Sequence, residues 1–161
     1  MTQAKDPMRS REPWGRAHGG NSPVIVIGLD GSPTSWDAFS WAAGEAARLG
    51  GRLIAVYVTP AMEPGAALGV PFDYAAAQQA RQELTSQLRD DAERRAHDIG
   101  VPISFVRELG DIADALTSVA QSVDAQLLVV GRSAKLLHHV AGSLSRRIIA
   151  RPDAPVVVVV P

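Results

Sequence analysis

Five short runs of apolar, mostly β-branched residues alternate along the chain with longer segments that have helical periodicity. This alternation is typical of parallel strands joined by crossover helices. Each run is hydrophobic throughout, as expected of strands that helices cover on both faces. The sequence therefore predicts one α/β domain built on a doubly wound, five-stranded parallel sheet. The five runs occupy residues 24–29, 53–58, 103–106, 127–130 and 156–160.

Capping residues indicate where the intervening helices begin and end. Ser32 can cap a helix that begins at the following proline. Proline has no N–H, and the N–H of the first helical residue has no partner within the helix, so nothing is lost there. Residues 73–99 are expected to form one long helix closed by Gly100, and Asp111 and Ser143 to cap the last two helices. The apolar faces expected to pack on the sheet are Phe39, Ala42, Ala46 and Leu49 on the first helix and Ala77, Ala80, Leu84, Leu88 and Ala92 on the long one.

The composition excludes several classes of function. The 16 Lys and Arg and 17 Asp and Glu residues give a formal net charge of −1, so there is no basic excess to attract nucleic acid or an anionic membrane. A chain without cysteine forms no disulfides and suits the cytoplasm. No apolar run reaches the roughly 18 residues of a membrane span. We expect residues 1–22 to be a disordered N-terminal arm, without the apolar core of a signal peptide, and residues 23–161 to be the folded domain.

The segment after the fourth run combines glycine and hydroxyl residues in a way that suits an anion. In an open parallel sheet, ligands bind outside the carboxyl ends of the strands, where the strand order reverses. Gly131 can adopt a positive φ and bring the backbone close to a ligand. Gly142 and Ser143 place free N–H groups and a hydroxyl at a helix N-terminus, which attracts phosphate, and Ser145 adds a second hydroxyl. We therefore expect the ligand site to centre on residues 131–145.

Four short motifs, taken together, resemble the universal stress protein family in its UspA-like, single-domain actinobacterial form. They are VIGLDGS at 26–32, LVVG at 128–131, GSLS at 142–145 and APVVVVV at 154–160. The resemblance implies a flavodoxin-like or Rossmann-like sheet of strand order 3-2-1-4-5 and a homodimer formed through the last strand, Val156–Val160. In one branch of the family, ATP is held by a loop of the form Gly-x-x-Gly, nine residues, Gly-Ser/Thr. Another branch does not bind ATP.

The resemblance also implies roles for individual residues. Asp30 would lie near the nucleoside, Val58 would line the adenine pocket, and Gly131 would begin the phosphate loop. The start of the last helix would hold the phosphates of ATP, with Mg²⁺ bound through them. The cofactor-binding residues implied in this way are Asp30, Val58, Gly131, Ala134, Gly142, Ser143, Leu144 and Ser145.

The phosphate loop departs from the family pattern in two ways. Ala134 stands where the family has its second glycine, and only seven residues, 135–141, separate it from Gly142. An alanine at a position that requires a positive φ costs about 1 kcal/mol or more. A shorter loop also offers fewer N–H groups to a phosphate, so both departures favour weaker ATP binding.

Motifs of other nucleotide and catalytic sites are missing from the sequence. The turn after the first run lacks the Gly-x-Gly-x-x-Gly of dinucleotide dehydrogenases, and neither a P-loop Gly-Lys-Ser/Thr nor a Gly-x-Ser-x-Gly occurs. We expect no catalytic residues and at most slow ATP hydrolysis. His138 and His139 lack a third ligand at metal-binding spacing, so we expect no metal site. Arg146 and Arg147 could reach phosphate, although arginines on a surface helix are more often solvated.

Two functional interpretations remain open at this point. The first is a stress-response regulator that binds ATP or a related adenine nucleotide. The second is a regulatory or scaffold homodimer without a nucleotide, because a strand of five valines is an exposed pairing edge that a symmetric partner strand would cover. In that case Asp30 would only shape a turn with Gly31, and Gly142 and Ser143 would only cap a helix.

Overall fold

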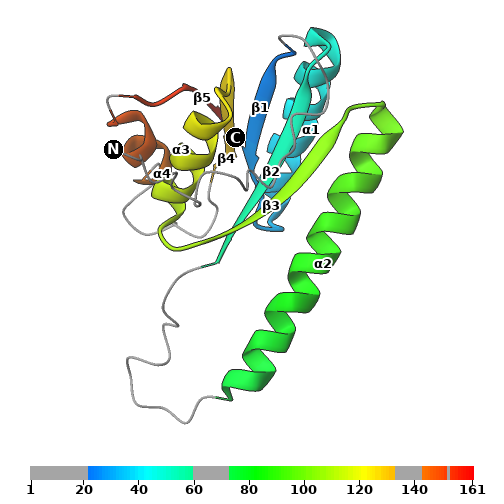
Figure 1. The fold of residues 1–161 in the computed structure, drawn as a ribbon, viewed down its shortest axis with the longest axis vertical. Helices are drawn as coiled ribbons and strands as arrows, with labels where there is room; N and C mark the ends of the chain where they lie inside the picture. The colour runs from blue at the N-terminus through cyan, green and yellow to red at the C-terminus, as the bar shows by residue number, and fades with distance from the viewer. Residues whose placement is uncertain (1–21, 60–72, 133–142, 152) are drawn as a thin grey trace, which may run out of the picture.

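The computed structural model describes residues 22–59, 73–132, 143–151 and 153–161, which form one sheet with helices on both faces (Figure 1). The strands are β1 (Val24–Gly28), β2 (Arg52–Thr59), β3 (Ile103–Leu109), β4 (Leu127–Gly131) and β5 (Val156–Val160), and the helices are α1 (Pro33–Leu49), α2 (Tyr74–Ile99), α3 (Ile112–Ser122) and α4 (Ser143–Ile149). All strand pairs are parallel, and the strand order is β3-β2-β1-β4-β5. The predicted α/β class, doubly wound sheet and strand order are confirmed. Residues 1–21, nearly all of the predicted N-terminal arm, lie outside the described residues.

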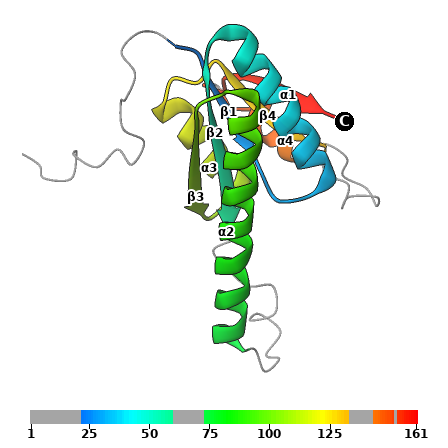
Figure 2. The same ribbon diagram turned by 90° about the vertical axis from the view of Figure 1, so that its right-hand side faces the viewer.

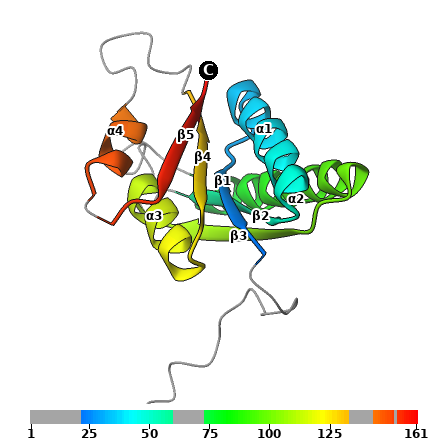
Figure 3. The same cartoon turned by 90° about the horizontal axis from the view of Figure 1, so that it is seen from above.

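The two faces of the sheet carry separate hydrophobic clusters. Helices α1 and α2 cover one face, and α3 and α4 cover the other (Figure 3). The first cluster includes Phe39 of α1 and Leu88 of α2, and the second includes Leu116 of α3 and Ile148 of α4. Successive residues of a strand point to opposite faces, so a strand that is apolar throughout, such as β1, contributes to both clusters.

The two edge strands differ from the prediction that helices cover every strand on both faces. In β5, Val156 is 65% exposed and Val159 is 40% exposed, and β3 has Val106 as its one buried residue. An edge strand has a neighbouring strand on one side only, so more of its surface stays exposed. The valines of β5 read like those of an interior strand because hydrophobicity alone does not reveal a strand's position in the sheet.

Side-chain and glycine caps set the helix ends, as predicted. The Ser32 hydroxyl accepts a hydrogen bond from the N–H of Ser35 at 3.2 Å. Gly50 and Gly100 end α1 and α2 with φ values of 63° and 77°. Both values lie in the left-handed region that glycine adopts without strain. Helix α4 begins at Ser143 itself, so Ser143 takes the first helical position instead of the predicted cap.

The prediction of the apolar face of α2 is correct only for its C-terminal part. Leu88 and Ala92 are buried, but Ala80 and Leu84 are exposed and Ala77 is only partly buried. The helix has 26 residues and so measures about 39 Å, whereas the 7-residue strand β3 measures about 23 Å. Figure 2 shows that the N-terminal part of α2 therefore extends beyond the sheet. None of the described helices is long and apolar enough to cross a membrane.

Two alanine substitutions test this division between packed and projecting segments. Phe39 is 1% exposed, so Phe39→Ala should lower the free energy of unfolding by about 3–5 kcal/mol through the cavity it leaves. Leu84 is 37% exposed, so Leu84→Ala should lower it by about 0.5 kcal/mol or less. Urea denaturation measures both values, and similar losses would show that Leu84 packs on the domain.

Candidate functional site

A cavity of about 270 Å³ lies at the carboxyl edge of the sheet, where the strand order reverses between β1 and β4. Its lining comes from the ends of β1, β2 and β4 and from the N-terminal parts of α1, α3 and α4. Parallel topology brings these segments together, because every strand ends and every helix begins at this edge. This is the position at which open α/β sheets bind their ligands.

Part of the lining is apolar. Val56 and Val58 come from β2, Val130 from β4, Leu116 from α3 and Leu144 from α4. Val56, Leu116 and Val130 are buried, and Val58 and Leu144 pack against the same cluster as partly buried side chains. A surface of this kind favours the transfer of a flat aromatic ring out of water.

Asp30 provides a carboxylate in the lining and also shapes the turn that leads into α1. Its Oδ1 accepts a hydrogen bond from the N–H of Ser32 at 2.9 Å, and its own N–H donates to the hydroxyl of Ser35 at 3.4 Å. Gly31 has a φ of 83°, which completes the turn. The structural role considered for Asp30 is thus present, and the same turn places Asp30 beside Ser32 and Ser35 in the cavity lining.

Gly131 is required by close packing, and the positive φ predicted for this glycine is wrong. Gly131 is not among the described glycines with positive φ. A Cβ atom at this position would lie 2.4 Å from the carbonyl oxygen of Thr34 and 2.9 Å from the nitrogen of Ser35. The end of β4 therefore lies directly against the first turn of α1, and no side chain fits between them.

An ion pair joins α3 to α4 in the cavity lining. One terminal nitrogen of the Arg147 guanidinium lies 2.8 Å from Oδ1 of Asp111. The same oxygen caps α3 by accepting the N–H groups of Ala113 and Asp114 at 3.0 and 3.1 Å. Asp111 thus has a fixed position, and Arg147 is held against it.

The structure brings together some of the predicted site residues. Asp30, Val58, Gly131 and Leu144 all line the cavity. Ser145 is partly buried on α4 but is not part of the lining, and Ser143 begins that helix. The described part of the chain does not include Ala134, Gly142, His138 and His139. Among the described residues, no group of three His, Cys, Asp or Glu side chains is placed to hold a metal ion.

Sequence reasoning missed the part of the cavity that the helix starts provide. Ser32 and Asp111 were considered only as caps, and Arg147 was named as able to reach phosphate but judged to be more often solvated. A general signal was available for the caps. Every helix of a doubly wound sheet that follows a strand starts at the carboxyl edge, so each N-cap is a candidate site residue.

Comparison with known proteins decides the family. Residues 23–160 match the family model described as the universal stress protein family. The chain belongs to this family. A universal stress protein of Mycobacterium tuberculosis is 36% identical over 140 residues, which cover 86% of this chain and 45% of that protein. The chain therefore spans about half the length of the curated relatives it matches.

Solved structures of the family share the fold of this universal stress protein. A family member from Burkholderia pseudomallei is 26% identical, with a TM-score of 0.69 and coverage of 86% of this chain and 95% of that one. A universal stress protein crystallised in complex with cAMP is also 26% identical, with a TM-score of 0.61 and coverage of 86% and 96%.

The packing at Gly131 can be tested with two glycine substitutions. Gly131→Ala should lower the free energy of unfolding by about 1–3 kcal/mol, because the new methyl group meets the backbone of α1. Gly44→Ala is the matched control. A Cβ atom there has no neighbour within 4 Å, so the helical preference of alanine should stabilise the protein by about 0.5–1 kcal/mol. Chemical denaturation should give opposite signs, and equal effects would contradict the packing described for β4.

Proposed function

We propose that this universal stress protein binds an adenine nucleotide in the cavity between β1 and β4 and acts as a regulator in the stress response. The carrying observation is that an apolar lining and the Asp30 carboxylate meet in one cavity at the reversal of strand order. The cAMP complex of a relative that is 26% identical supports an adenine nucleotide as the ligand. We place this function in the cytoplasm, which a chain without cysteine suits.

The chemistry of the lining suits the two halves of a nucleoside. The base would contact the apolar side chains of Val58 and Leu116, which removes it from water. The carboxylate of Asp30 can accept hydrogen bonds from the ribose hydroxyls, since an ionised carboxylate is an acceptor only. Its hydrogen bond with Ser32 holds it in place before the ligand arrives.

The size of the cavity favours a small nucleotide. Its volume of about 270 Å³ is just below the range of roughly 300–1,000 Å³ that is typical of ligand pockets. A nucleoside monophosphate fits this volume better than a nucleoside triphosphate does. ATP, with Mg²⁺ bound through its phosphates, is the larger ligand to compare, and Ala134 and the seven-residue spacing favour its weaker binding.

Calorimetric titration of nucleotide-stripped protein with adenosine, AMP, cAMP and ATP, with and without Mg²⁺, tests the proposal. Asp30→Asn keeps an acceptor for the turn but removes the charge. Hydrogen bonds to charged groups contribute about 1.5–3 kcal/mol, so affinity should fall at least about tenfold.

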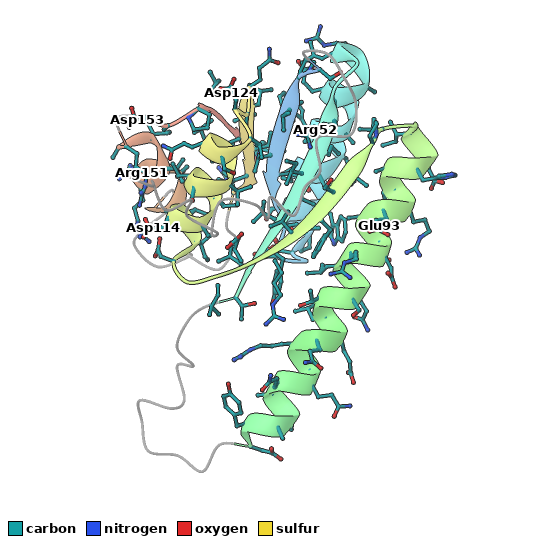
Figure 4. All side chains as sticks on the ribbon, in the orientation of Figure 1. Arg52, Glu93, Asp114, Asp124, Arg151 and Asp153 are labelled. Carbon is teal, nitrogen blue, oxygen red and sulfur yellow. The ribbon has the colours of Figure 1, made fainter. Side chains whose placement is uncertain are left out.

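Asp124→Asn is the matched control for this titration. It makes the same change in net charge just beyond the C-terminal end of α3, whereas the N-terminal end of α3 lines the cavity. Figure 4 labels Asp124 at this place. Asp124 has a φ of 50°, a conformation that asparagine tolerates. Equal losses in the two variants, or no binding of any of these ligands at millimolar concentration, would refute the proposal.

We also propose that the protein forms a homodimer through β5. In the described part of the chain this strand pairs with β4 alone, and Val156 and Val159 are exposed on it. A second β5 related by two-fold symmetry would satisfy the free backbone groups and cover these valines. The same edge favours the second candidate function, a regulatory or scaffold dimer that acts without a nucleotide.

A charge on the edge strand should separate the subunits. Val159→Lys places an ammonium group from each subunit among the side chains of the paired edge strands, so the dimer should dissociate at micromolar concentration in sedimentation velocity. Leu84→Lys, on the projecting part of α2, should leave the dimer intact. A wild-type protein that sediments as a monomer throughout would exclude the proposed interface.

A further inference from the structure

The charges around the cavity raise the question of how it could accept a phosphate. Among the described residues of the lining, the carboxylates are those of Asp30 and Asp111, and Arg147 is the single cation. Without Arg147, the charged side chains among these described lining residues would all be negative. The position of this one guanidinium therefore decides whether the described part of the cavity suits a charged ligand or a neutral one.

Arg147 reaches the cavity because of its place on α4. It follows Leu144 by three residues, so the two side chains share one face of the helix, and both line the cavity. Arg146 is the adjacent residue and points elsewhere: it is exposed and is not part of the lining. The side chains of these two neighbouring arginines therefore point in different directions, and only that of Arg147 lines the cavity.

Two ion pairs connect α3 with α4 and with the segment that follows α4. Arg147 pairs with Asp111, and one turn later Arg151 contacts Asp114 (Figure 4). Asp111 is anchored by the backbone of α3, so it stays in place whether or not Arg147 is bound to it. The Arg147 and Asp111 side chains are 54% and 39% exposed, and solvent screens a pair of this kind. A phosphate can therefore replace Asp111 as the partner of Arg147.

We propose that Arg147 recognises the phosphate of the bound nucleotide and that Asp111 is the partner of the guanidinium that the phosphate replaces. This inference rests on the proposed adenine-nucleotide function and adds to it the group that distinguishes nucleotides from nucleosides. The planar guanidinium can donate two parallel hydrogen bonds to a phosphate, and a neutral nucleoside offers no such acceptor. The site should therefore select phosphorylated adenine compounds.

The test compares AMP with adenosine, which differ by the phosphate alone. The wild-type protein should bind AMP at least about tenfold more tightly than adenosine at low ionic strength, and added salt should reduce this preference. Arg147→Gln should abolish most of the preference. Arg147→Lys should keep part of it, because an ammonium retains the charge but loses the paired geometry. Arg146→Gln, the matched control, should keep the full preference.

Asp111→Asn tests whether Asp111 competes with phosphate for Arg147. Asparagine caps a helix as well as aspartate does, so α3 keeps its start, but the carboxylate that competes with phosphate is removed. AMP affinity should rise severalfold in this variant while adenosine affinity changes little in comparison. A purely structural role for Asp111 would instead lower both affinities together.

Four results would overturn the inference. If Arg147→Gln keeps the wild-type preference for AMP, or if Arg146→Gln loses as much of it as Arg147→Gln does, Arg147 has no specific role. Adenosine binding by each variant shows that its cavity is folded. If the wild-type protein binds neither AMP nor adenosine, the inference fails, and the proposed function fails with it only if cAMP and ATP do not bind either. Binding of both AMP and adenosine without the expected preference overturns the inference alone.

Discussion

The end of β4 lies so close to the first turn of α1 that only a hydrogen atom fits at Gly131. This contact brings Gly131, the last residue of β4, against α1, the helix that follows β1. It thereby fixes how closely the end of β4 approaches the start of α1 at the carboxyl edge of the sheet, where the cavity lies. The turn at Asp30, held by its bond to Ser32, lies at the same edge and also lines the cavity. Both the fold and the candidate site depend on this backbone approach.

Features that repeat locally could be predicted from the sequence, and features that depend on distant segments could not. The apolar runs and the caps revealed the strands and the helix ends. The exposure of Leu84 depends on the difference in length between α2 and its neighbouring strand, which hydrophobic periodicity does not report. Likewise, the contact between Asp111 and Arg147 joins two helices that the topology brings together, and no local pattern links them. The close packing at Gly131 is of the same kind.

Helix caps serve two purposes at this edge of the sheet. Ser32 and Asp111 satisfy backbone N–H groups at the starts of α1 and α3, and both also line the cavity. A group that is already fixed by the backbone loses little freedom when a ligand binds, which favours affinity. The same overlap means that truncating a cap would change stability and binding together. Substitutions that keep the cap, such as asparagine for aspartate, are therefore the informative ones.

The two parts of α2 are stabilised in different ways, because its N-terminal part projects beyond the sheet. From Thr85 onward its buried side chains tie it to the sheet, but before that residue it is maintained by local interactions, such as the Asp73 cap and the bond between Gln79 and Glu83. A helical segment in which no described side chain is buried can open while the rest of the domain stays folded. Its amide hydrogens would exchange with solvent far sooner than those nearer Gly100, so the cooperative folding unit is smaller than the set of residues that are helical.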